Sequence, residues 1–276
     1  METKVRYELM TPGEIVAARE RCPVVYLPLG PMEWHGPHLP IGTDALVAHH
    51  VALRVAAAVG GLVMPALFAG TDSLRAPGSG AGALQALGLT GSERVVGMDF
   101  PGFPVKSLYF EESVLGLTVR EFVRRLKAEP YRLIVLVNFH GAGNHKHTLE
   151  RIALEESDEP RVRVILPAFG DPPTSPDVDP GHAEKWETEM MMALEEPHVR
   201  LSALPQLDRP LPYPQFGIVE GRAFAGNPPP DFVLSRTADP RIADREEGIS
   251  LVAEAVKFVA KVVTDNLNEV LAQHPS

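Results

Sequence analysis

The sequence predicts an α/β fold in which a mostly parallel sheet is covered by helices on both faces. Short apolar runs alternate with longer amphipathic segments along the whole chain of 276 residues. This alternation is typical of strands joined by crossover helices, which pair in parallel and are buried on both sides. The chain has no internal repeat and no low-complexity linker, so we expect a single domain over residues 1–276.

The individual elements are predicted by their caps and by their periodicity. TPGE at 11–14 is a capping box with proline at the first helical position, so a helix should begin there. Compact apolar runs indicate buried strands, and a period near 3.6 indicates helices. Strands are expected at 23–29, 62–68, 131–139 and 161–169, and helices from Thr43 or Asp44 to 60–61, at 112–129, from 146 to 156, at 182–195, and as one long closing helix at 239–273 with Pro240 at its first position.

Composition excludes several classes of partner. The net charge is −10 and the pI is about 5.5, whereas nucleic acids and anionic membranes favour a basic face. The only cysteine is Cys22, so no internal disulfide can form and a reducing compartment fits best. The N-terminus lacks an apolar signal core, and no apolar run approaches a membrane span. We expect a cytoplasmic protein that binds neither nucleic acid nor membrane.

The loop after the first strand, GPMEWHGPHLPIGTD at 30–44, contains several side chains that bind metals. Glu33 and His35 are two residues apart and would point the same way from an extended segment, and Asp44 follows at a helix start. Carboxylates and imidazoles are the usual ligands of Zn²⁺ and Mn²⁺. The alternative is structural: Asp44 caps the helix, and His35 bonds a backbone carbonyl.

Two later loops add to this set at the same expected sheet edge. His140 directly follows the most apolar strand, and His182 and Glu187 lie near a helix start. Taken singly, His140 could be a structural histidine, and the glutamates could be a solvated acidic helix terminus. Together the loops supply too many ligands for one structural zinc and a suitable number for two catalytic metals with a general acid or base. Asp44 is the expected bridge between the two metals.

These residues lie in segments that resemble the motifs of the creatininase (creatinine amidohydrolase) family. The first loop resembles G-S-x-E-Q-H-G-P-H-L-P-x-x-T-D, and LIVLVNFHGAGN resembles a strand ending in N-G-H-G-G-N. HAEKWET is similar to H-A-G-x-x-E-T, and DFPGF to a G-F-P-G turn. The order and approximate spacing of the motifs match over residues 10–195, and the DPR helix start at 239 also fits.

The resemblance implies a layered α/β/α fold, a dinuclear site and a homo-oligomer of two to six chains. One metal would be held by Glu33, Asp44 and His140, and the other by His35, Asp44 and a further glutamate. Creatininase takes that glutamate from two residues after the loop histidine, which is Ala142 here, so the role passes to Glu187. The metals would be zinc or manganese, with iron as a further option.

The implied activity is hydrolysis of a C–N bond in a small cyclic or non-peptide amide, of lactam or formamide type. A metal-bridging hydroxide would attack the carbonyl, and His182, with a pKa near neutrality, would protonate the leaving nitrogen. Glu187 counts with His182 as a catalytic candidate. Two alternatives are a catalytically silent binding or scaffold subunit and, less favoured by the acidic composition, a two-metal phosphoesterase.

Several departures from the motifs are expected to alter the substrate rather than the ligand set. The second loop gains one residue, which displaces Asn144, and Phe139 stands where glycine is usual. In the other loops, Trp34, Glu184 and Glu189 replace the residues common in the family. The candidate substrate contacts are Trp34, Trp186 and Glu184. Segment 69–100 is expected to shape the pocket or a subunit contact, with Arg75 and Arg94 as possible anion contacts or ordinary surface residues.

Overall fold

The computed structural model describes residues 4–75, 95–99, 103–159, 161–169, 182–209, 211 and 238–273. The expected alternation of strands and helices is present. The helices are α1 (Pro12–Arg21), α2 (Thr43–Val59), α4 (Glu112–Lys127), α5 (Gly143–Glu156), α6 (Lys185–Glu195) and α7 (Arg245–Ala272), with short 3₁₀ turns at Tyr7–Leu9, Glu196–His198, Leu201–Ala203 and Pro240–Ile242. The strands are β1 (Val24–Gly30), β2 (Leu62–Val63), β3 (Leu67–Phe68), β4 (Leu74–Arg75), β5 (Val95–Val96), β6 (Leu133–Asn138) and β7 (Arg163–Ile165).

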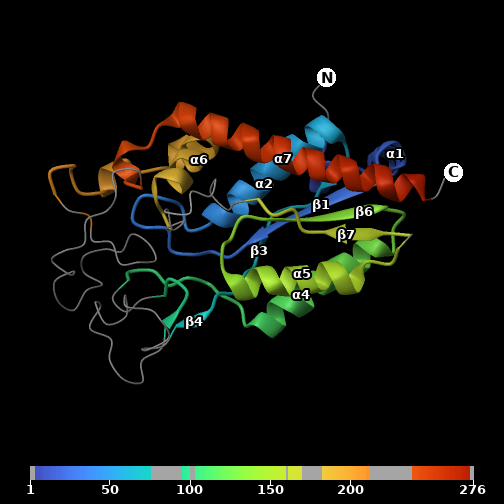
Figure 1. Ribbon diagram of the computed structural model, residues 1–276, viewed down its shortest axis with the longest axis horizontal. Coiled ribbons are helices and arrows are strands. Elements are labelled where there is room, and N and C mark those ends of the chain that lie inside the picture. The colour runs from blue at the N-terminus through green and yellow to red at the C-terminus, as the bar shows by residue number, and fades with distance from the viewer. Residues whose placement is uncertain are drawn as a thin grey trace.

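The main sheet is parallel and lies between two layers of helices. Its order is β2-β1-β6-β7, with β3 also pairing with β1, and each of these pairs is parallel. Figure 1 shows α2, α6 and α7 on one side of this sheet and α4 and α5 on the other. Strands β4 and β5 form a separate antiparallel pair. The α/β/α architecture predicted from the sequence is therefore confirmed.

The two central strands are buried along their whole length, which explains why they read as continuous apolar runs. Alternate side chains serve alternate faces. Val24 and Tyr26 pack with α2, α6 and α7 in one core cluster, whereas Val25 and Leu27 pack with α4 and α5 in the other. Each helical layer is thus stabilised by burying its apolar face against one side of the same strands.

Several expected boundaries were wrong in detail, among them the start of α6 at Lys185 rather than 182 and the extent of β7, which is Arg163–Ile165 rather than 161–169. Helix α2 is capped by Gly42, so neither Thr43 nor Asp44 is the N-cap. The run at 62–68 is two short strands, because Pro65 lies between them and cannot donate to a ladder. Helix α5 begins at Gly143, three residues before the expected start. The closing segment is a 3₁₀ turn at Pro240–Ile242 followed by α7, whose N-cap Asp244 accepts hydrogen bonds from the N–H groups of Glu246 and Glu247.

The carboxyl ends of β1 and β6 lie level, since Leu29 pairs with Asn138 in the parallel register. The first and second candidate loops therefore leave the sheet side by side. Gly30 lets the start of α2 approach the end of β1, because a Cβ there would lie 2.6 Å from the Cβ of Asp44. No helix within the described ranges is both long and apolar enough to cross a membrane.

Candidate metal centre

One group of donor atoms forms where the loops after β1 and β6 meet the start of α2. His140 Nδ1 lies 3.1 Å from Glu33 Oε2 and 3.1 Å from Asp44 Oδ2. All three residues are almost fully buried. Glu33, Asp44 and His140 could hold a metal ion, because their donor atoms lie within 4.8 Å of one another. These are the three residues that the resemblance to the creatininase motifs assigns to one metal.

A second group lies on the other side of Asp44. His35 Nε2 is 3.4 Å from Asp44 Oδ1 and 3.9 Å from Glu187 Oε2. Helix α6 brings Glu187 to this point from its first turn. His35, Asp44 and Glu187 also meet the distance criterion for a metal site. Asp44 therefore presents one oxygen to each group, which is the arrangement expected of a bridging carboxylate.

Hydrogen bonds orient both imidazoles so that the opposite ring nitrogen faces the carboxylates. The backbone oxygen of Thr71 lies 3.1 Å from His140 Nε2, and that of Glu33 lies 3.0 Å from His35 Nδ1. A carbonyl can only accept, so these ring nitrogens donate, and the opposite nitrogens are the ones that could bind a metal. A histidine bonded to a carbonyl in this way is typical of metal sites. For His35, the hydrogen bond to a backbone carbonyl uses Nδ1 and leaves Nε2 as the nitrogen that could bind a metal.

Unpaired polar atoms mark the same place. Glu33 Oε2, His35 Nε2 and Asp44 Oδ2 are buried and have no hydrogen-bond partner among the described residues. Buried polar atoms are nearly always partnered, so atoms without a partner indicate a missing ligand such as an ion. Three buried carboxylates and two imidazoles are also a donor set that suits two divalent cations of the zinc or manganese type. The residues present therefore fit the metals that the motifs imply.

The charges of the centre are strongly coupled. Burial opposes ionisation of both Asp44 and His35, yet their mutual attraction lowers the pKa of Asp44 far below its usual value. Burial alone would lower the pKa of His35, but Asp44 and Glu187 raise it to about 10. Burial raises the pKa of Glu187 to about 7. A divalent cation competes with these protons, so its binding would release them.

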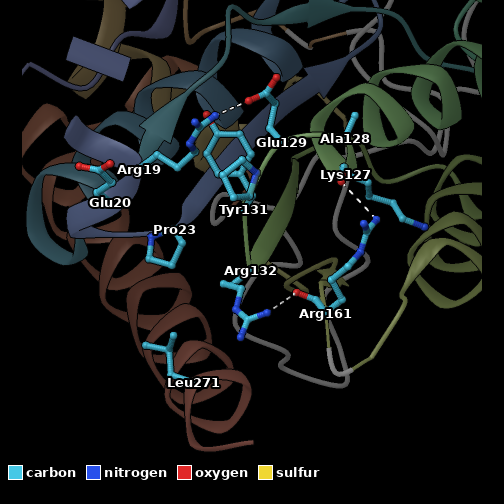
Figure 2. Close-up of a pocket in the computed structure, with 11 residues that line it drawn as sticks. Arg19, Glu20, Pro23, Lys127, Ala128, Glu129, Tyr131, Arg132, Arg161 and Leu271 are labelled. Atoms are coloured by element: carbon cyan, nitrogen blue, oxygen red, sulfur yellow. Dashed lines mark hydrogen bonds and ion pairs between the residues drawn. The ribbon is translucent and has the colours of Figure 1, made fainter. Parts of the chain in front are cut away.

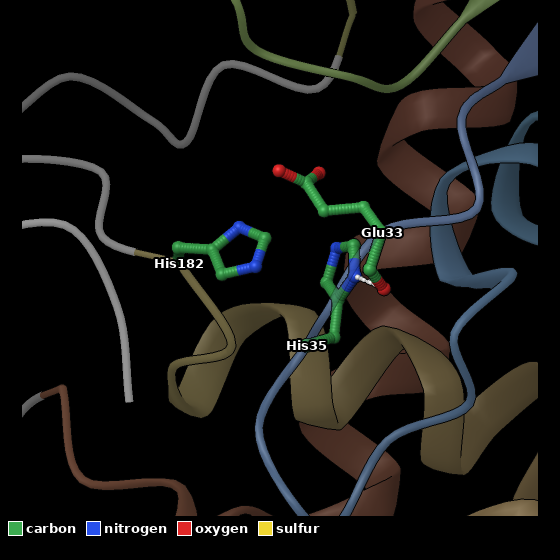
Figure 3. A group of neighbouring side chains, drawn as sticks. All are labelled: Glu33, His35 and His182. Carbon is green, nitrogen blue, oxygen red and sulfur yellow. Dashed lines mark hydrogen bonds between the residues drawn. The ribbon is translucent and has the colours of Figure 1, made fainter. Parts of the chain in front are cut away.

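His182 stands beside both groups. With Glu33 and His35 it forms a third set of convergent donor atoms, and its ring lies 4.2 Å from that of His35 (Figure 3). Its Nε2 donates to the backbone oxygen of Trp34. Burial, followed by the charge of His35, lowers the pKa of His182 to about 4. This value is lower than the near-neutral pKa expected from the sequence.

The backbone is strained at the residue after His182. Ala183 has φ of 57°, a left-handed conformation that costs free energy for any residue with a Cβ. Its N–H donates to Glu187 Oε2 at 2.5 Å. The turn therefore links the orientation of His182 to the position of the Glu187 carboxylate.

Several supporting residues were missed by sequence reasoning. Tyr109 donates to Glu33 Oε1 at 2.5 Å and accepts the N–H of Met98 at 3.0 Å. Nothing in the sequence around Tyr109 marks it, because the contact depends on a fold that joins residues 76 positions apart.

A second support lies behind His140. His145 Nε2 bonds Asn138 Oδ1 at 3.0 Å, and the amide of Asn138 in turn bonds the backbone of His140. Thr71 N–H donates to His145 Nδ1 at 3.3 Å, which fixes the neutral tautomer of that ring. The extra histidine in HGAGNH was the available signal for this role.

The candidate substrate contacts pack against neighbouring aromatic rings or begin a helix. Trp34 stacks on Phe103 at 4.6 Å, and Trp186 stacks on Phe139 at 5.1 Å. Glu184 is the buried N-cap residue of α6. Their roles in substrate binding stay predictions.

Glu189 and Asn144, two further positions that depart from the family motifs, contact neighbouring residues. Glu189 pairs with Lys185 at 2.5 Å and accepts the N–H of Asp244 at 3.1 Å, so it joins α6 to the start of α7. Asn144 lies in the first turn of α5 and accepts from the N–H of His145 at 3.0 Å. Within segment 69–100, Arg75 ends β4, whereas Arg94 and the residues at 76–93 lie outside the described residues, as does the loop at 171–181.

Known proteins resemble this chain over most of its length. The family model Creatininase, described as creatinine amidohydrolase, matches residues 8–263. A creatinine amidohydrolase from Pseudomonas putida is 26% identical over 259 residues, covering 88% of this chain and 89% of that protein. The chain belongs to the creatininase family, and it is a metal-dependent amidohydrolase that acts on C–N amide bonds.

Solved structures share the fold over nearly the whole chain. A putative creatinine amidohydrolase from Bacteroides fragilis aligns with a TM-score of 0.65 at 21% identity, covering 97% of this chain and 98% of its own. A mutant creatininase of the Zn-Zn type aligns with a TM-score of 0.63 at 21% identity, covering 96% and 99%. Other creatininases with this fold include a manganese form and a mutant complexed with creatine.

Proposed function

We propose that this protein uses two divalent metal ions to hydrolyse a C–N bond in a small cyclic or non-peptide amide of lactam or formamide type. The observation that carries the proposal is the position of Asp44 between two buried donor groups, one with Glu33 and His140 and the other with His35 and Glu187. A single ion would be held by one of these groups and would leave the donors of the other without a partner.

Zinc or manganese is the proposed metal, with iron as a further option. Solved creatininases named as Zn-Zn and manganese forms support the choice. When bound, two divalent cations polarise an amide carbonyl and lower the pKa of a water. The mixed nitrogen and oxygen donors of this chain suit both zinc and manganese.

His182 is proposed to move the proton. Its Nε2–H is held by the Trp34 carbonyl, so the neutral ring keeps its basic lone pair on Nδ1. Its lowered pKa means that the ring is neutral at rest, accepts a proton during attack on the carbonyl, and passes it to the leaving nitrogen. Glu187, with Ala183 N–H on Oε2, is proposed to complete the second donor group while it fixes the turn that carries His182.

The substrate is proposed by chemistry rather than by name. A mutant creatininase of this fold has been solved with creatine, which supports a small polar ligand. Creatinine itself is disfavoured here, because Ala142 stands where creatininase has its second-loop glutamate. Trp34, Trp186 and Glu184 are proposed to line the substrate's side of the centre.

The family assignment and the intact ligand set disfavour the two other functions that the sequence left open. A silent binding or scaffold subunit would not need the intact ligand set, and a phosphoesterase would favour a more basic site than this acidic chain predicts. We also infer a single domain, a cytoplasmic location and a homo-oligomer of two to six chains. The exposed side chains of Leu117 and Leu154, at 70% and 81%, support an apolar contact between copies.

The test is a substrate panel with metal-loaded protein. Lactams and formamides are assayed beside aryl phosphates, on wild type and on His182→Ala. We expect turnover of at least one amide, no turnover of phosphates, and a loss in kcat of about 10²-fold or more in the variant, with its metal content unchanged. Turnover of phosphates alone would favour the phosphoesterase, and a His182→Ala enzyme with full kcat would remove the proton-transfer role.

A further inference from the structure

A cavity lies at the edge of the sheet opposite the candidate metal centre. We define the amino-edge pocket by Arg19, Tyr131, Arg132, Arg161 and Leu271, which line a cavity of about 700 Å³ together with neighbouring residues. Pro23, Arg132 and Arg161 come just before β1, β6 and β7, so the amino ends of these strands form its base. Figure 2 shows Arg19 and Glu129 toward one end, Arg132 and Arg161 toward the other, and Tyr131 between them.

Unpaired polar atoms mark this pocket as they mark the metal centre. Seven buried side-chain nitrogen or oxygen atoms in the described residues have no hydrogen-bond partner. Three of them belong to the candidate metal ligands, and two more, Tyr131 Oη and Arg19 Nε, belong to residues that line the amino-edge pocket. Tyr131 is 2% exposed, so bulk water does not readily serve its hydroxyl. Such atoms need an explanation, and a ligand supplies one.

The available groups are donors. An arginine Nε–H can only donate, and burial raises the pKa of Tyr131 to about 12, so its hydroxyl keeps its proton. Four basic and two acidic side chains line the cavity, in a chain whose net charge is −10. Arg19 pairs with Glu129. Arg132 forms no ion pair with any described residue, and its side chain donates only from Nη1, to the carbonyl of Arg161 at 3.1 Å.

Helix ends explain part of this charge and leave the rest unexplained. Arg19 and Lys127 lie in the last turns of α1 and α4, where the helix dipole favours cations. Arg132 lies on no helix, and the dipole does not provide a partner for the Tyr131 hydroxyl. The walls contributed by Pro23 and Leu271 add apolar surface.

We infer that the amino-edge pocket binds a small organic oxyanion, with Arg132 pairing with the anionic group and the Tyr131 hydroxyl donating a hydrogen bond to it. Hydrogen-bond donors that include an unpaired guanidinium favour a ligand with carboxylate or phosphate oxygens. This site uses none of the residues of the metal centre, so it stands or falls independently of the proposed hydrolase activity.

The experiment measures binding of inorganic phosphate and, separately, of succinate to the full metal-loaded chain by titration calorimetry at constant ionic strength. We expect saturable binding of at least one of them to wild type. Arg132→Gln should raise the Kd by about tenfold or more, because a charge-assisted hydrogen bond is lost. Arg125→Gln is the matched control, since Arg125 is 81% exposed on α4 and lies outside the pocket.

Tyr131→Phe separates a ligand site from a merely structural one. Without ligand, the variant should unfold at the same or a higher temperature, because it removes a buried hydroxyl that has no hydrogen-bond partner in the described part of the chain. The rise in Tm that the ligand gives wild type should be smaller in the variant. Binding of phosphate alone identifies a phosphorylated ligand, and binding of succinate alone a carboxylate. The inference is overturned if neither anion binds at millimolar concentration, or if Arg125→Gln weakens binding as much as Arg132→Gln.

Discussion

At the scale of single residues, the candidate metal ligands Glu33 and His140 are held by groups that the sequence does not mark. Tyr109 occupies one oxygen of Glu33 and so leaves Oε2 to face His140. Thr71 and Asn138 hold the ring and backbone of His140. Such partners set the orientation and the tautomer of a ligand, and metal affinity depends on both. The preorganisation of the centre is thus distributed over the residues around it.

Tyr109→Phe tests this dependence. Loss of the hydroxyl frees Glu33 Oε1, so the carboxylate can rotate away from His140, and we expect affinity for one metal equivalent to fall by about 10- to 100-fold. The measurement is competition with a chromophoric chelator. Tyr26→Phe is the control, because its hydroxyl donates to Gly60 O at 3.1 Å, away from the centre. Equal metal affinity in both variants would contradict the role of Tyr109.

At the scale of elements, the centre depends on how α6 is held. The Oγ1 atom of Thr188, next to Glu187, lies 2.9 Å from His38 Nε2. This contact links α6 to the first loop. Glu189 links α6 to α7, and Gly248 of α7 lies against the α6 backbone. These contacts place the first turn of α6, and therefore Glu187, next to His35.

Gly248→Ala tests the packing of α6 on α7. A Cβ at position 248 would lie 1.9 Å from the carbonyl oxygen of Glu189, so the helices must separate. We expect the free energy of unfolding to fall by about 2 kcal/mol or more. Gly116→Ala in α4 is the matched control, since its Cβ would meet Thr148 at an ordinary 3.6 Å and should stabilise the helix by about 0.5–1 kcal/mol. Denaturant titration measures both, and equal effects would contradict the account.

Helices α4 and α5 are joined by a charge cluster that predicts a dependence of stability on pH. Glu156 is 6% exposed and accepts hydrogen bonds from Arg120, Arg124 and Lys127. Burial opposes its ionisation, but Arg120 and Lys127 outweigh this and hold its pKa below the usual value. Since the folded pKa is the lower one, the stabilisation is fully present above pH 4.5, the ordinary value, and is lost as the pH falls through the folded pKa.

Glu156→Gln should therefore destabilise the protein by about 1–2 kcal/mol at pH 7, a modest figure because Arg124 is exposed to solvent. The difference between variant and wild type should shrink as the pH is lowered below 4, where wild type also loses the charge. Chemical denaturation at several pH values measures it. A difference that stays constant with pH would exclude the ion pairs as its cause.

At the scale of the whole molecule, the two edges of the sheet carry different chemistry. The carboxyl edge brings buried carboxylates and imidazoles together, and the amino edge carries guanidinium groups and the Tyr131 hydroxyl. The parallel arrangement produces this division, because all the strand ends of one kind lie at one edge. Substitutions in the segments at one edge of the sheet can therefore leave the chemistry of the other edge unchanged.

This arrangement also explains what the sequence could predict. The layered fold, the meeting of the loops after β1 and β6, and the convergence of Glu33, His35, Asp44, His140 and Glu187 follow from strand periodicity and from motifs with local spacing. Tyr109 and Thr71 could not be predicted, because their contacts span 76 and 69 residues. The lowered pKa of His182 also depends on burial, which one sequence does not define for a loop.

The central claim is that two metals share Asp44, with Glu187 completing the second group. The most direct test is metal content per chain by elemental analysis, on protein purified without chelator and reloaded with zinc or manganese. We predict two equivalents in wild type and in Glu189→Gln, whose side chain contacts Lys185 and the start of α7, and about one equivalent in Glu187→Ala. Wild type that takes up no metal, or a Glu187→Ala variant that keeps two equivalents, would contradict the account.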